Sequence, residues 1–151
     1  MQKVSTTGSG RLILRSSLDE LQRLTAWVEH IASEAALTAE QAFALQLCLE
    51  EAVANIVMYG GAAVDAPIAV EVSQAGGDLT VAIEDSARPF DPTQVPPREK
   101  PASLDQARVG ALGVHLIRHY SSQMRYERRN GRNCLMLTFN RAGIPNIESG
   151  Q

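Results

Sequence analysis

Residues 45–57 read LQLCLEEAVANIV, an apolar run that contains the carboxylate of Glu51 and the carboxamide of Asn55 four residues apart. The run is long enough for a buried helix, and 3.6 residues per turn place both groups on one face. Tyr59 falls on the same line, another four residues along. A buried acid and amide can also be a hydrogen-bonded pair with a purely structural role in the core. Whether they form a functional site therefore depends on the other motifs of the chain.

The composition indicates one ordinary globular domain. The chain has 151 residues, 44% hydrophobic and 21% charged, which suits a single core. A formal net charge of −3, without a dense basic block, argues against nucleic-acid binding. The start of the chain shows no signal-peptide pattern and no apolar run reaches membrane-spanning length, so we expect a cytoplasmic protein that does not enter the membrane.

Cysteine and histidine give no sign of a disulfide or a structural metal. Cys48 and Cys134 both stand in apolar surroundings, which favours buried, reduced thiols. His30, His115 and His119 lack metal-site spacing with cysteine or aspartate.

Hydrophobic periodicity predicts the order strand, helix, helix, hairpin, loop, helix, hairpin. The hairpins favour a mixed, mostly antiparallel sheet, and helices with one apolar face favour coverage of one side of it. We therefore expect an α/β (α+β) two-layer sandwich. The expected strands are residues 11–15, 68–72, 79–84, 124–128 and 134–139; the expected helices are residues 21–35, a helix from a Thr38–Gln41 capping box to Gly60, and residues 114–120.

The same reading sets the limits of the domain. Residues 1–10 are polar and rich in Gly, Ser and Thr, so we expect a mobile N-terminus, and residues 142–151 read as a C-terminal tail. The folded domain is then residues 11–141. Residues 86–109 contain several prolines and no periodic pattern, and an irregular stretch of this length is usually a functional loop or lid.

A second motif follows the strand at residues 79–84. Residues 85–92 read DSARPFDP, and a carboxylate where a strand breaks into a loop can point into a pocket. As an acceptor, Asp85 suits the exocyclic amine of a planar base. The alternative is that Asp85 only starts the loop by forming an Asx turn.

A third motif, VGALGVHLI at residues 109–117, places Gly110 and Gly113 at the start of a helix. Glycines allow the backbone to approach a ligand closely, and the free amides at a helix N-terminus suit phosphates. Two glycines before a helix are a weak signal alone. Combined with the acid–amide helix, the Asp motif and the loop, they predict a nucleotide site.

The three motifs, in this order and spacing, resemble the sequence boxes of the GHKL (Bergerat-fold) ATPases. The Pro-Phe-Asp-Pro continuation, the short chain and the closing hairpin resemble the anti-sigma-factor serine kinase branch of that superfamily in bacteria. The resemblance covers residues 11–140. It implies the Bergerat fold, with ATP and Mg²⁺ as cofactors.

The resemblance also implies roles for individual residues. Asn55 would bind Mg²⁺ through its side-chain oxygen, and Glu51 would be the general base for the attacking hydroxyl. Asp85 would accept a hydrogen bond from the adenine amino group. Gly110 and Gly113 would frame the lid and the phosphate-binding helix start.

Two arginines in the loop and three positions that differ from the family pattern also bear on the predicted site. Arg88 or Arg108 would supply positive charge to the phosphates, the alternative being that they are solvated lid residues. Ala87 and Ala111 stand where the family usually has glycine, and alanine resists a positive φ. Tyr59 stands where the family often has histidine. These departures bear on nucleotide affinity and lid geometry.

Three functional classes follow from the resemblance. The first is an ATP-dependent serine/threonine kinase that sequesters a sigma factor and phosphorylates a STAS-type anti-anti-sigma protein. The second is a nucleotide-binding anti-sigma or interaction module with weak or no kinase activity. The third, a histidine kinase catalytic domain, needs a preceding phosphoacceptor helix pair, and only about ten residues precede the first strand. Retention of both Glu51 and Asn55 favours the kinase.

Assembly and partner contacts can also be predicted. Relatives of this type work as homodimers, and the strand at residues 11–15 offers an edge for pairing. Glu20, Arg23 and Trp27 on the first helix are candidates for exposed partner contacts, the alternative being an ordinary solvated face.

Overall fold

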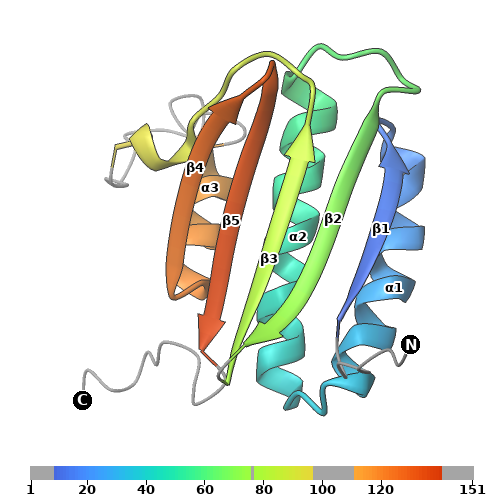
Figure 1. Ribbon diagram of the computed structural model, residues 1–151, viewed down its shortest axis with the longest axis vertical. Coiled ribbons are helices and arrows are strands. Elements are labelled where there is room, and N and C mark those ends of the chain that lie inside the picture. Colours follow the sequence, from blue (N-terminus) through green and yellow to red (C-terminus); the bar gives the residue numbers. More distant parts are fainter. Residues whose placement is uncertain (1–8, 76, 97–110, 141–151) are drawn as a thin grey trace, which may run out of the picture.

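The computed structural model describes residues 9–75, 77–96 and 111–140, which contain three α-helices and five strands in the expected order (Figure 1). The third helix begins at Ala111, earlier than the expected residue 114, so Gly113 lies within its first turn. The elements are β1 (Gly10–Arg15), α1 (Leu21–Glu34), α2 (Ala39–Tyr59), β2 (Pro67–Ala75), β3 (Asp78–Asp85), α3 (Ala111–Tyr120), β4 (Gln123–Arg129) and β5 (Arg132–Asn140), with short 3-10 helices η1 (Leu18–Glu20) and η2 (Pro92–Gln94).

The strands form one open sheet in the order β1-β2-β3-β5-β4 (Figure 1). Each pairing between described strands is antiparallel. The expected two-layer α+β sandwich is confirmed, and its described sheet is antiparallel throughout rather than mixed. The β4–β5 turn has Asn130 at φ 53° and Gly131 at φ 74°, the left-handed conformation that a two-residue hairpin needs.

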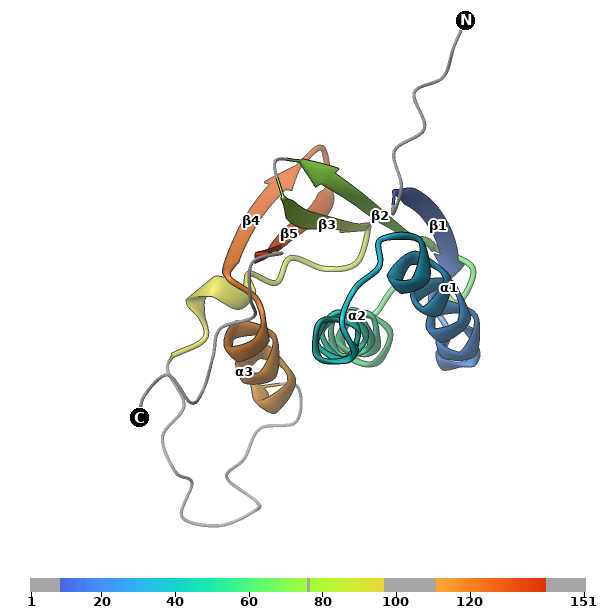
Figure 2. The ribbon, with the colours of Figure 1, turned by 90° about the horizontal axis from the view of Figure 1, so that it is seen from below.

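The three helices cover one face of the sheet, with α2 between α1 and α3 (Figure 2). The core forms between this layer and the alternate, inward-facing residues of the strands. Its largest fully buried side chains are Leu14, Leu24, Ile31, Leu45, Leu49, Ile68, Leu79, Ile83, Ile117 and Leu137, with Val28 and Val53.

Helix α2 starts at the predicted capping box. The Thr38 hydroxyl accepts a hydrogen bond from the Gln41 backbone N–H at 3.1 Å, and the Gln41 side chain accepts one from the Thr38 N–H at 2.9 Å, so two otherwise unpaired amides at the helix start are satisfied. By length and composition alone α2 could cross a membrane, but here it packs beneath the sheet.

The arrangement gathers the three sequence motifs at one end of the molecule. β3 ends at Asp85, which is paired in register with Asn133 near the start of β5. The C-terminal half of α2, the end of β3 and the start of β5 lie at the upper end of the molecule in Figure 1. This end is where a site can form.

The limits of the folded domain are only partly visible. Gly10, expected in the mobile N-terminus, is already part of β1, while residues 1–8 and the expected tail at 142–151 lie outside the described residues. Of the expected lid, residues 86–96 are described and residues 97–109 are not.

Candidate functional site

Glu51 and Asn55 lie on the face of α2 that meets the first turn of α3. A Cβ atom added to Gly113 would lie 2.5 Å from Glu51 Oε1 and 3.5 Å from Asn55 Nδ2. Any side chain at Gly113 would therefore displace the carboxylate. The glycine lets a helix N-terminus, a carboxylate and a carboxamide meet. The helix N-terminus can bind a phosphate, and the carboxylate can accept a proton.

Asp85 closes β3 and is only 4% exposed. Its Oδ1 accepts two hydrogen bonds, from the Ala87 backbone N–H at 2.9 Å and from Asn133 Nδ2 at 3.0 Å. The first of these is an Asx turn, so that interpretation of Asp85 is correct for Oδ1. Oδ2 accepts no hydrogen bond from the described residues, which leaves one carboxylate oxygen for a ligand.

Ala87 and Ala111 stand where the family usually has glycine, but neither adopts the positive φ that would strain an alanine. The non-glycine residues with positive φ in the described chain are Ala36 and Asn130, and Ala111 is the first residue of a helix. Ala87 is buried, and a Cβ added to Gly60 would lie 2.5 Å from the Ala87 methyl. Gly60 thus provides the space that alanine at position 87 needs.

Arg88 lies against the end of α2. Its backbone N–H and its Nε both donate to the Gly60 carbonyl, at 3.1 and 3.3 Å, and its guanidinium lies over Gly61, whose φ is 74°. A cation at the C-terminal end of a helix is favoured by the helix dipole. Arg88 is thus held at the end of α2, while Arg108 and Gly110 lie outside the described residues.

Sequence reasoning missed Asn133, a buried polar residue that contacts Asp85. The signal was present, because Asn133 shares the inward face of β5 with Leu135, Leu137 and Phe139, where an amide is unexpected. A polar side chain in the buried register of a strand needs partners, and here residues 85–90 of the Asp motif provide them.

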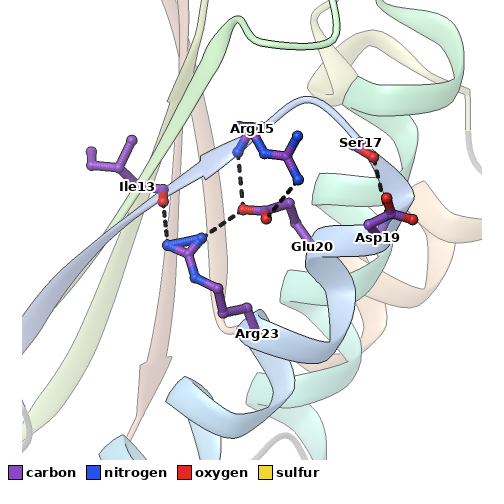
Figure 3. Close-up of polar contacts among 6 residues, drawn as sticks. All are labelled: Ile13, Arg15, Ser17, Asp19, Glu20 and Arg23. Atoms are coloured by element: carbon purple, nitrogen blue, oxygen red, sulfur yellow. Dashed lines mark hydrogen bonds and ion pairs between the residues drawn. The ribbon is translucent and has the colours of Figure 1, made fainter.

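Glu20 is not an exposed partner contact, so that expectation is wrong. Its side chain is 8% exposed and accepts hydrogen bonds from the Arg15 backbone N–H at 3.1 Å and from Arg23 at 2.6 Å (Figure 3). The pKa of Glu20 lies below its ordinary value of 4.5, mainly because of the Arg15 N–H bond and despite the opposing effect of burial. Arg23 also donates to the Ile13 carbonyl at 2.7 Å, and Trp27 packs partly buried against the core.

The thiols take no part in this arrangement. Cys48 is fully buried on α2, and burial raises its pKa to about 12, with a smaller contribution from the Glu51 charge. It is a neutral core side chain. Cys134 is half-buried on β5, more exposed than expected, and neither cysteine forms a disulfide.

The donor set suits one kind of metal site. Within the described ranges no three His, Cys, Asp or Glu side chains group together as a metal cage. Mg²⁺ needs no such cage, because it is usually held by one or two protein oxygens together with substrate phosphates and water. The amide of Asn55, beside the Glu51 carboxylate and the start of α3, fits that requirement.

Comparison with known proteins gives concordant results. Residues 14–139 match the family model of the histidine kinase-like ATPase domain. The serine/threonine-protein kinase BtrW of Bordetella bronchiseptica is 36% identical over 113 residues, which cover 74% of this chain and 80% of that protein. The structure of the RsbU and RsbW domains of Rv1364c from Mycobacterium tuberculosis aligns with a TM-score of 0.62 at 16% identity, over 85% of this chain and 32% of that one.

Proposed function

Because the chain belongs to the histidine kinase-like ATPase family, we propose that it is an ATP-dependent anti-sigma factor. It sequesters a sigma factor and phosphorylates a serine on a STAS-type anti-anti-sigma protein. The observation that carries this proposal is the position of Gly113, where even an added Cβ atom would lie 2.5 Å from Glu51 Oε1 and 3.5 Å from Asn55 Nδ2; a base, an amide and a helix start thus lie together. The name of the relative BtrW, a serine/threonine-protein kinase, supports the kinase part.

The nucleotide is bound at both ends. Asp85 Oδ2 accepts a hydrogen bond from the adenine amino group, and the start of α3, framed by Gly110 and Gly113, donates its backbone amides to the phosphates. Arg108 adds positive charge to the phosphates. Arg88 adds charge from the end of α2, where its guanidinium is already held by the Gly60 carbonyl.

Glu51 is the general base. As the serine oxygen forms its bond to the γ-phosphorus, the bond to the β-phosphate oxygen breaks, ADP leaves, and the serine proton moves to the Glu51 carboxylate. Asn55 holds Mg²⁺ through its side-chain oxygen. The ion, when bound, neutralises negative charge on the phosphates.

The chain works as a cytoplasmic homodimer in this proposal, and the structure limits how two copies can pair. β1 is an edge strand, yet its Arg15 N–H and Ile13 carbonyl already bind Glu20 and Arg23 (Figure 3). Side chains that occupy edge groups in this way hinder strand addition. Pairing along β1 is therefore restricted to its N-terminal half, around Arg11.

Titration calorimetry tests the nucleotide site directly. ATP should bind much more tightly with Mg²⁺ than without it, and Asn55→Ala should abolish the difference because the side-chain ligand is removed. Asn140→Ala, at the exposed end of β5, is the matched control and should behave like the parent. No binding of adenine nucleotide at millimolar concentration would refute the assignment.

A further inference from the structure

Asn133 is fixed in one orientation by the groups around its amide. Its Oδ1 accepts hydrogen bonds from the Phe90 backbone N–H at 3.3 Å, from Arg128 NH1 at 3.1 Å and from the Tyr126 hydroxyl. Peptide N–H and guanidinium groups can only donate, so exchanging the amide oxygen and nitrogen would place donors against donors. The nitrogen of Asn133 must therefore face Asp85.

The two N–H groups of that amide join Asp85 to its own loop. Nδ2 lies 3.0 Å from Asp85 Oδ1 and 3.0 Å from the Arg88 carbonyl, and 3.4 Å from the Ala87 carbonyl. Arg128 adds a bond to the Ala87 carbonyl at 2.9 Å. The carboxylate and the backbone that follows it are thus held to β4 and β5 as one unit.

This network determines which part of Asp85 a ligand can meet. Oδ1 has both acceptor positions filled, by the Ala87 N–H and by Asn133. Oδ2 receives nothing from the described residues. If Asn133 did not bind Oδ1, only the Ala87 N–H would hold that oxygen, and the carboxylate could swing further about its Cβ–Cγ bond, because that torsion is broad.

We propose that Asn133 is the positioning residue for nucleobase selection. It orients Asp85 so that Oδ2, which accepts no hydrogen bond from the described residues, faces the base. This inference rests on the proposed function and extends it to specificity. The 6-amino group of adenine donates to such an oxygen, whereas the 6-oxo group of hypoxanthine or guanine would place an acceptor against it. Fixing the carboxylate makes this discrimination sharp.

The experiment compares ATP with ITP, which differ at position 6 of the base, in calorimetry with Mg²⁺. A hydrogen bond to a charged group corresponds to about 10- to 100-fold in affinity, so the parent should prefer ATP by about that factor. Asn133→Leu keeps a side chain of similar size but removes the donor to Asp85. Asn133→Ala removes the donor together with most of the side chain. Asn140→Leu, at the exposed end of the same strand, is the matched control.

In both Asn133 variants the preference for ATP over ITP should fall to less than about three-fold, while ITP affinity stays near that of the parent. A merely structural role would weaken both nucleotides equally and leave their ratio unchanged. A parental ratio in a folded variant overturns the inference, as does failure of both variants to fold, which would assign Asn133 to stability. A parent that binds neither nucleotide refutes the proposed function instead. A parent that binds both equally leaves the nucleotide site standing and removes base selection by Asp85.

Discussion

A methyl group at Gly113 would perturb the site at its most crowded point. The added Cβ would lie 2.5 Å from Glu51 Oε1, about 1 Å closer than the ~3.5 Å at which non-bonded heavy atoms usually rest. Asn55 Nδ2, at 3.5 Å, would remain in ordinary contact. Gly113→Ala should therefore move the carboxylate by about 1 Å and leave the amide in place.

The effect on stability should be small. Glu51 is half-buried, and an off-rotamer side chain costs about 0.5–1.5 kcal/mol. Alanine in a helix is about 0.5–1 kcal/mol more favourable than glycine. These effects oppose each other, so the net change should stay within about 1 kcal/mol, or about 2–4 °C in Tm. Misplacing a catalytic group by about 1 Å can cost about 10²-fold in rate, so phosphotransfer should fall by about that factor.

The assay combines scanning calorimetry with phosphotransfer in the parent, Gly113→Ala, Glu51→Ala and the double variant. With no carboxylate to displace, the methyl group should change the Glu51→Ala rate by less than about two-fold. The reasoning is refuted if Gly113→Ala transfers phosphate as fast as the parent. It is equally refuted if the methyl group costs the same factor in both backgrounds, because it would then act on the nucleotide and not on Glu51.

Three further outcomes are expected. Asp85→Asn keeps an oxygen for the Ala87 N–H but presents an NH₂ group in place of Oδ2, so calorimetry should show ATP affinity lower by at least about 10-fold with little change in Tm; equal affinities would remove Asp85 from the site. Glu20→Gln should lower the free energy of urea unfolding by about 1 kcal/mol at about pH 7. Because the pKa of Glu20 is lowered on folding, its stabilisation is fully present above 4.5 and is lost as the pH falls through the lower pKa of the folded state; a difference that does not decline as the pH falls below 4.5 would contradict this origin. Light scattering at micromolar concentration should show a dimer, and a monomer unchanged by ATP would contradict the proposed assembly.

Much of the fold could be predicted because local patterns agreed with the tertiary structure. The Thr38–Gln41 capping box starts α2, and the Asn130–Gly131 pair forms the hairpin turn with positive φ at both residues. The spacing of Glu51 and Asn55 correctly predicted a shared face, because helical geometry alone determines it. The three motifs together predicted a common nucleotide site, and in the structure this face of α2 meets the first turn of α3.

The parts that could not be predicted depend on contacts between distant segments. Glu20 was placed on an exposed helix face, but it lies in η1 before α1 and its carboxylate binds the backbone of β1, which periodicity cannot reveal. The role of Asn133 arises from its register opposite Asp85. The sequence could not show that Ala87 would fit, because the room for its methyl group is left by the missing side chain of the distant Gly60.

Phosphate transfer from labelled ATP to a STAS-domain protein tests the central claim most directly. The parent, with Mg²⁺, should label a serine of that protein. Glu51→Ala should bind ATP and the sigma factor within a few-fold of the parent, yet transfer phosphate at least about 10²-fold more slowly, because it lacks the general base. Transfer by the variant at the parental rate would place the base elsewhere. A parent that binds ATP and the sigma factor but labels nothing would contradict the kinase and favour a nucleotide-binding anti-sigma module.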